Sequence, residues 1–314
     1  MKHHVIIALK GMAMGIAETI PGVSGGTIAF ITGIYEKLLD SIKAFAPQLF
    51  TTFRKEGIAA SWKQINGPFL LPLGIGMVMG IVFGVLVVSH FLENYPPIIW
   101  AFFFGLIVSS VIYIARQVGK WTAIEIAGFI GATILAFWLT TVSPASGNEA
   151  LWFVFLSGAI AISALILPGI SGSFILLIMG MYSYILPLVK NDLKTFDTDG
   201  LIVMAVFSLG CLVGLTTFAR VLSWTFKQYR SIALAVLTGF MLGSLNKIWP
   251  WRNVISTRIN SSGEEVPFLE KSVLPSIYEG ETFLMLSIVA AIIGFISVFI
   301  FEKFGNQEEL TTND

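Results

Sequence analysis

Apolar residues follow one another in eight long runs that account for most of the chain. Six of these runs are continuous and close to the roughly 20 residues that an α-helix needs to cross the hydrocarbon core of a bilayer. We expect a transmembrane helix in each of the six: 69–91, 98–115, 121–141, 201–226, 231–249 and 283–301. The other two runs, 5–39 and 151–189, are interrupted by proline and glycine, and each has the length of two short half-helices around a break.

The two interrupted runs are broken in the same way. The first break lies in GIAETIPGVSGGTIAF (15–30) and the second in ISALILPGISGSFILL (162–177). These segments align without gaps at an offset of 147 residues, so that the two Pro-Gly pairs coincide. Beyond the next loop the offset becomes 134, and it pairs Gly76 with Gly210, Gly80 with Gly214, and Gly105 with Gly239. We infer an internal duplication.

The duplication predicts an all-α polytopic membrane protein with one transmembrane domain over 1–314. Repeat 1 covers about 5–141 and repeat 2 about 150–302, and each holds one broken, re-entrant helical hairpin and three transmembrane helices. If each hairpin enters and leaves on one side, three helices separate the copies. Because three is odd, the copies have opposite orientations, as in the inverted repeats of many secondary transporters. The inversion holds equally if the hairpins span fully.

Positive charges predict the orientation. The turns at 90–97 and 142–150 hold no Lys or Arg, whereas the intervening loops hold many: Lys37, Lys43, Arg54, Lys55, Lys63, Arg116, Lys120, Lys227 and Arg230. Cytoplasmic loops are richer in Lys and Arg, so we expect a multi-pass protein of the cytoplasmic membrane with both termini inside. The loop 247–280 is the exception, because it is predicted outside and yet carries Lys247, Arg252, Arg258 and Lys271.

Composition supports a membrane protein and excludes several other classes. Of the 314 residues, 55% are hydrophobic and 12% are charged, against about 25% charged in soluble domains. The net charge of zero suggests no nucleic-acid partner. Cys211 is alone and cannot form an intrachain disulfide, and three histidines with one cysteine predict neither a metal site nor another cofactor. The first apolar run, interrupted by Lys10 and Glu18, does not resemble a cleavable signal peptide.

The breaks themselves are the candidate functional site. A helix that restarts after a break exposes free N–H groups and a partial positive charge, which suit an anion such as a phosphate. The candidate residues are Ser24, Gly25, Gly26 and Thr27 in the first hairpin and Ser171, Gly172 and Ser173 in the second. The alternative is that these small residues allow close helix packing.

Two charged residues extend this candidate site. Glu18 and Thr19 precede the first break, and repeat 2 has Leu165 and Ile166 in their places. A carboxylate at membrane depth is a functional hypothesis by default, and Glu18 would either carry a coupling proton or brace the break by accepting backbone hydrogen bonds. Arg220 would pair with Glu18, contact a substrate phosphate, or extend to the cytoplasmic interface.

The segment 41–66 mixes aromatic and basic residues without forming a further apolar run. We expect it to lie at the membrane interface, on the anionic cytoplasmic leaflet.

The paired motifs ETIPGVSGGTIAFITGIYEKLL and LILPGISGSFILLIMGMYSYIL resemble the signature of a bacterial membrane family associated with polyprenyl-phosphate transport. The resemblance covers nearly the whole chain. It implies that the substrate is undecaprenyl phosphate, the C55 lipid carrier of peptidoglycan and other envelope polymers. It also implies a flippase that returns this carrier from the outer to the inner leaflet.

Under this resemblance the lipid phosphate would bind at both hairpins, with Arg220 assisting and Glu18 coupling the cycle to protons. One alternative is a secondary transporter of a small soluble anion. An enzyme is not expected, because the chain has no His-Glu-x-x-His helix, no Gly-x-Ser-x-Gly elbow and no histidine near the motifs. The oligomeric state is not predicted.

Overall fold

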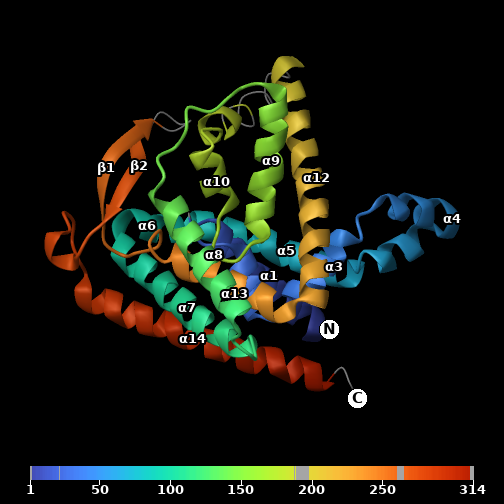
Figure 1. The fold of residues 1–314 in the computed structure, drawn as a ribbon, viewed down its shortest axis with the longest axis horizontal. Helices are drawn as coiled ribbons and strands as arrows, with labels where there is room; N and C mark the ends of the chain where they lie inside the picture. The colour runs from blue at the N-terminus through green and yellow to red at the C-terminus, as the bar shows by residue number, and fades with distance from the viewer. Residues whose placement is uncertain (1, 21, 187, 189–197, 260–264, 312–314) are drawn as a thin grey trace.

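A computed structural model describes residues 2–20, 22–186, 188, 198–259 and 265–311. The described chain is mostly helical, with a single pair of strands in the described residues (Figure 1). The elements of the first half are α1 (Lys2–Glu18), α2 (Gly25–Ile31), α3 (Tyr35–Lys43), α4 (Pro47–Gln64), α5 (Gly67–Phe83), the π-helical turn η1 (Gly84–Val88), α6 (Ser89–Asn94), α7 (Pro96–Gln117) and α8 (Ala123–Thr141). The second half contains α9 (Leu151–Ile166), α10 (Gly172–Ile178), α12 (Thr198–Gln228), α13 (Arg230–Ser244), β1 (Arg252–Ile259), β2 (Glu265–Ser272), the 3₁₀ turn η2 (Pro275–Ile277) and α14 (Leu284–Thr311).

Four helical stretches in the described residues are long and apolar enough to cross a membrane. They are Gly67–Asn94, Pro96–Gln117, Ala123–Thr141 and Gly200–Gln228. The helices α9 and α13 and the stretch Leu284–Ile300 are apolar but shorter. The expected membrane protein is therefore supported. The helix predicted over 231–249 ends at Ser244, because the polar Asn246 and Lys247 lie in the turn that follows.

The predicted helix over 69–91 is longer than expected and changes geometry along its length. It runs from α5 through the π-helical turn η1 into α6. At the start of this turn Gly84 meets the side chain of Thr19, and a Cβ on Gly84 would lie 2.4 Å from Thr19 Oγ1. The close approach of the segment before the first break therefore coincides with the π turn, a feature often found at functional positions.

Both Pro-Gly motifs interrupt their helices with the same backbone turn. Helix α1 ends at Glu18 and α2 starts at Gly25, while α9 ends at Ile166 and α10 starts at Gly172. Between them Gly22 has a φ of 89° and Gly169 a φ of 87°. Residues with a Cβ rarely adopt this left-handed conformation, so the turn requires glycine.

Equivalent helices of the two halves make equivalent close contacts. Helix α5 packs on α1, and a Cβ on Gly76 would lie 1.9 Å from the carbonyl oxygen of Ala8. Helix α12 packs on α9, and a Cβ on Gly210 would lie 2.1 Å from the carbonyl oxygen of Phe155. The contact in the second half is therefore the repeat of the contact in the first. The two glycines are 134 residues apart and their two partners 147 residues apart, which are the offsets found in the sequence.

The last helix of each half packs on the other half. Helix α8 lies against α13, and α14 lies against α7. The closest approaches again use matched glycines, since Gly239 meets the carbonyl of Phe129 and Gly105 meets the carbonyl of Ala291. The two halves are therefore interlocked through their final helices.

The two ends of the molecule differ. The start of α1 and the end of α14 lie on the same side, α4 projects from the body, and the strands lie at the opposite end (Figure 1). Helix α4 exposes Phe50 and Ile58, and its expected place at a membrane interface stays a prediction. No strands were expected in the loop 247–280. There β1 and β2 pair antiparallel, with Arg252 opposite Ser272.

Candidate functional site

The two helix breaks lie directly against each other inside the molecule. The Ser24 hydroxyl donates a hydrogen bond to the Leu165 carbonyl at 2.9 Å, and the Gly169 N–H group donates to Thr27 Oγ1 at 3.0 Å. A third link runs from the Tyr35 hydroxyl to the carbonyl of Ile166 at 3.1 Å. These bonds join segments more than 130 residues apart in sequence, so the structure brings together the two motifs that the sequence predicted to share a site.

Most of the predicted donors of the first hairpin already have protein partners. The Gly25 N–H group donates to Glu18 Oε1 at 2.6 Å, and the Gly26 N–H group donates to the Ser24 hydroxyl at 3.1 Å. A Cβ on Gly26 would lie 2.4 Å from the carbonyl oxygen of Ile166. Gly26 thus lies in close contact with the second break, and Glu18 is bonded to the backbone that follows the first break. Thr19 donates to the carbonyl of Ile16 at 2.7 Å.

The second hairpin is less enclosed. Ser171 is buried and lies 2.8 Å, hydroxyl to hydroxyl, from the exposed Ser173. A Cβ on Gly172 would lie 2.5 Å from the carbonyl oxygen of Ala161, so this glycine also serves close packing.

Arg220 lies away from this arrangement on an exposed face of α12. Glu18, one of the three partners or positions considered for Arg220, accepts a hydrogen bond from the Gly25 N–H group through Oε1. The exposed position fits the interpretation in which the Arg220 side chain extends to the membrane interface.

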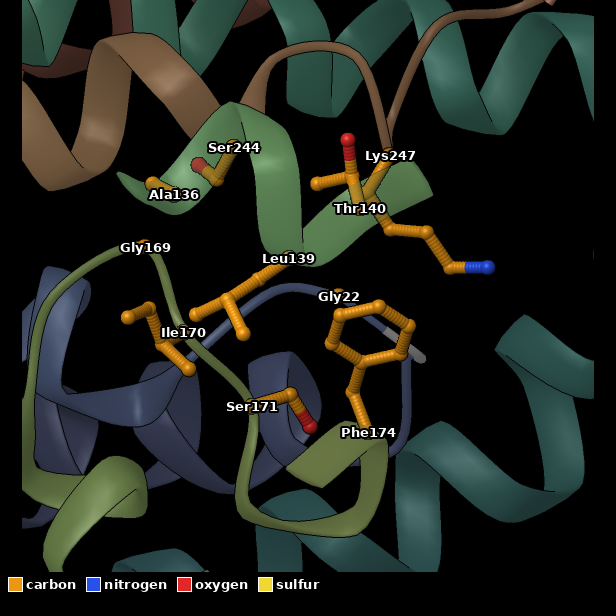
Figure 2. A pocket seen from close by; sticks show the side chains of 10 residues that line it. All are labelled: Gly22, Ala136, Leu139, Thr140, Gly169, Ile170, Ser171, Phe174, Ser244 and Lys247. Carbon is orange, nitrogen blue, oxygen red and sulfur yellow. The ribbon is translucent and has the colours of Figure 1, made fainter. Parts of the chain in front are cut away.

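A small hollow, open to the outside, lies between the two breaks and the helices above them (Figure 2). Residues of both breaks line it together with residues of α8 and of the end of α13: Gly22, Ala136, Leu139, Thr140, Gly169, Ile170, Ser171, Phe174, Ser244 and Lys247. Of the ten predicted site residues, Ser171 alone lines it. The wall is mainly apolar, with a few hydroxyl groups and one charged side chain.

Lys247 is the charged residue of this cavity, and it was not among the predicted site residues. Its side chain lies against Gly22, where a Cβ would be 3.1 Å from Lys247 Cγ. Its ammonium group lies 5.0 Å from the ring centre of Phe174 (Figure 2). Lys247 thus lies against the first break and beside the half-helix α10 that follows the second. A signal for it was present in the sequence, because the loop that begins there departs from the positive-inside pattern.

Ion pairs join the halves on the side of α3. Asp40 Oδ1 accepts hydrogen bonds from Ser223 at 2.7 Å, Lys43 at 3.2 Å and Lys227 at 3.3 Å. Glu36 Oε1 lies 2.5 Å from Arg230 Nη1. We call these six residues the α3 network. It ties repeat 1 to the α12–α13 turn and lies on the side that the Lys and Arg distribution predicts to be cytoplasmic.

Comparisons with known proteins identify the family of the chain. Residues 14–266 match the model of the VCA0040-like family, described as undecaprenyl phosphate translocase-like. The chain is 44% identical over 296 residues to a polyprenyl-phosphate transporter of Vibrio cholerae, covering 91% of this chain and 94% of that protein. It is 30% identical over 261 residues to a polyprenyl-phosphate transporter of Staphylococcus aureus, covering 77% and 85%. No solved structure matches it.

Proposed function

Because the chain belongs to the undecaprenyl phosphate translocase-like family, we propose that it transports a polyprenyl phosphate between the leaflets of the membrane. The relatives in Vibrio cholerae and Staphylococcus aureus carry the name of polyprenyl-phosphate transporters. Since both names describe transporters, no catalytic activity is proposed for the chain.

The observation that carries the proposal is the cavity shared by the two breaks. Non-helical backbone at membrane depth is tolerated where protein or a polar cavity surrounds it, and here the breaks surround a cavity with a lysine on its wall. An apolar wall beside one cation suits a lipid whose head is charged and whose adjoining isoprenoid chain is not. Shielding the head matters, because an unpaired ion in hydrocarbon costs several kcal/mol.

We propose an inverted repeat of 5–141 and 150–302 with re-entrant hairpins, within one transmembrane domain. Supporting observations are the matching φ angles of Gly22 and Gly169 and the equivalent glycine contacts of the two halves. Transporters of this architecture expose a central site to each side in turn by rocking one part against another.

We place the protein in the bacterial cytoplasmic membrane, with both termini in the cytoplasm. The proposed direction is the return of undecaprenyl phosphate from the outer to the inner leaflet, where peptidoglycan synthesis uses it. Supporting observations are the basic loops near α3 and the common side of the first and last helices (Figure 1).

Among the predicted site residues, Ser171 is the one we propose to face the phosphate, because it lines the cavity. We propose that Ser24, Gly25, Gly26 and Thr27 hold the two breaks together. Coupling of transport to protons through Glu18 stays a prediction.

A binding experiment separates this function from transport of a small soluble anion. The purified protein in detergent is heated with a C15 polyprenyl phosphate, with the corresponding polyprenol, or with inorganic phosphate. We expect the C15 phosphate to raise the melting temperature at micromolar concentration and the other two to leave it unchanged. Stabilisation by inorganic phosphate at the same concentration would favour the soluble-anion transporter.

A further inference from the structure

Two cations and one carboxylate are packed together beside the cavity, at the end of the molecule that carries the strands. Glu270 Oε2 on β2 lies 3.0 Å from Arg252 Nη1 on β1 and 3.8 Å from Lys247 Nζ. The side chain of Arg252 is 6% exposed, and those of Lys247 and Glu270 are 20% and 21% exposed. We call these three residues the basic cluster. It holds two positive charges and one negative charge in a largely buried place.

Arg252 is held by several contacts, but one of its N–H groups has no hydrogen-bond acceptor. Its Nη1 donates a hydrogen bond to the Lys247 carbonyl at 2.7 Å, and its guanidinium group lies 4.3 Å from the ring centre of Trp100. Its Nε is buried without a hydrogen-bond partner in the structure. A buried donor without a partner is costly, and an acceptor brought by a ligand would remove that cost.

Lys247 connects the cluster to the cavity. Its ammonium group lies above the Phe174 ring and is only loosely paired with Glu270, while the rest of its side chain covers Gly22. Lys247 therefore lines the cavity and also contacts Arg252, which bonds its carbonyl, and Glu270.

We propose that the basic cluster binds the phosphate monoester head of the transported lipid, and that Glu270 is a resident counter-ion which the phosphate displaces. The inference rests on the proposed function and names its binding residues. A phosphate monoester carries about −1.5 to −2 charges at neutral pH. This charge balances the two positive charges of Lys247 and Arg252 once Glu270 no longer pairs with them. Guanidinium groups bind phosphate oxygens with paired hydrogen bonds, and the lysine adds a point charge.

Glu270 stabilises the two cations of the basic cluster when no lipid is bound. Two buried cations without an anion would repel each other and lose their hydration. Glu270 compensates them in part, and because its separation from Lys247 is 3.8 Å, the lysine is the weaker of its two partners. The same arrangement accounts for Lys247 and Arg252 in a loop that is predicted to lie outside, where the proposed cycle takes up its lipid.

The test measures binding of a C15 polyprenyl phosphate to full-length protein in detergent, by equilibrium binding of the radiolabelled lipid. We expect Lys247→Gln to weaken binding about 10- to 100-fold, the range for a lost hydrogen bond to a charged group. Lys247→Arg should restore most of the affinity because it keeps the charge. Glu270→Gln should tighten binding several-fold, because no carboxylate then competes with the phosphate.

The matched control is Lys271→Gln, which removes a lysine from the exposed side of β2 next to the cluster. We expect wild-type affinity for it, and a melting temperature for each variant shows whether it is folded. Equal affinity of wild type, Lys247→Gln and Lys271→Gln would overturn the inference and leave the proposed function standing. Failure of the wild type to bind the C15 phosphate would overturn the proposed function itself.

A further arm distinguishes a lipid head from free phosphate. Inorganic phosphate is added as a competitor against the bound C15 phosphate. We expect displacement only at a concentration at least about 100-fold above that of unlabelled lipid, since free phosphate lacks the tail that the apolar wall contacts. Displacement at equal concentrations would assign the cluster to a soluble anion and overturn the lipid assignment.

Discussion

The carboxylate of Glu18 holds the end of α1 to the start of α2 through the Gly25 N–H group. Glu18→Ala would leave this enclosed donor without a partner, and we expect the free energy of unfolding to fall by about 1–3 kcal/mol. Glu18→Gln keeps an acceptor oxygen and should cost less. Thermal unfolding of both variants in the same detergent measures the difference. Equal stability of Glu18→Ala and wild type would contradict the bracing role.

The same pair of variants tests the proton prediction separately. If Glu18 carries a coupling proton, Glu18→Gln transports with a pH dependence different from that of the wild type although it remains folded. An unchanged transport rate and pH profile would contradict proton coupling through Glu18.

The sequence predicted that residues of the two breaks share one site, but it did not predict what each residue does there. Ser24 and Thr27 were expected to face a ligand, and the structure uses their hydroxyls to join the two breaks. Repeat patterns reveal equivalent positions, whereas the choice between ligand binding and packing depends on partners 140 residues away. Lys247 was visible only as an exception to a charge rule.

Glycine residues set the distance between packed helices. On α5, Gly76 touches the backbone of Ala8, whereas a Cβ on Gly74 would meet nothing within 4 Å. We expect Gly76→Leu to separate α1 from α5 and lower the free energy of unfolding by more than about 1–3 kcal/mol, because the obstacle is backbone. Gly74→Leu is the matched control on the same helix and should unfold near the wild-type temperature.

A result in which both leucine variants unfold alike would contradict the close α1–α5 contact. Such contacts were predictable, because apolar runs with regularly spaced small residues favour packed helices. The strands β1 and β2 were not predicted. They lie between α13 and α14. This segment was predicted to be a loop because it joins two apolar runs, and its own residue pattern was not used.

For the whole molecule, the proposed cycle requires the halves to separate on the side of the α3 network. Glu36 and Arg230 face each other there, and the one native cysteine, Cys211, can be replaced by alanine. In that background we expect a cleavable bifunctional reagent that joins Glu36→Cys to Arg230→Cys to stop transport, and a reductant to restore it. Each single cysteine variant treated alike serves as the control. An unaffected rate in the cross-linked protein would contradict opening at this side.

Removing the Glu36–Arg230 pair has a smaller expected effect than locking it. Both side chains are about half exposed, and exposed ion pairs contribute about 0.2–1 kcal/mol. We expect Arg230→Gln to lower the free energy of unfolding by less than about 1 kcal/mol, with the difference shrinking in high salt. A loss of several kcal/mol in thermal or denaturant unfolding would contradict this weak, separable contact.

Reconstituted vesicles show directly whether the chain moves a polyprenyl phosphate between leaflets. Purified protein is reconstituted with labelled undecaprenyl phosphate, and the fraction in the outer leaflet is followed with a reagent that cannot cross the bilayer. We predict rapid exchange between leaflets with wild type and with Lys271→Gln, and slow exchange with Lys247→Gln and in protein-free vesicles. Exchange with wild-type protein no faster than in protein-free vesicles would contradict it.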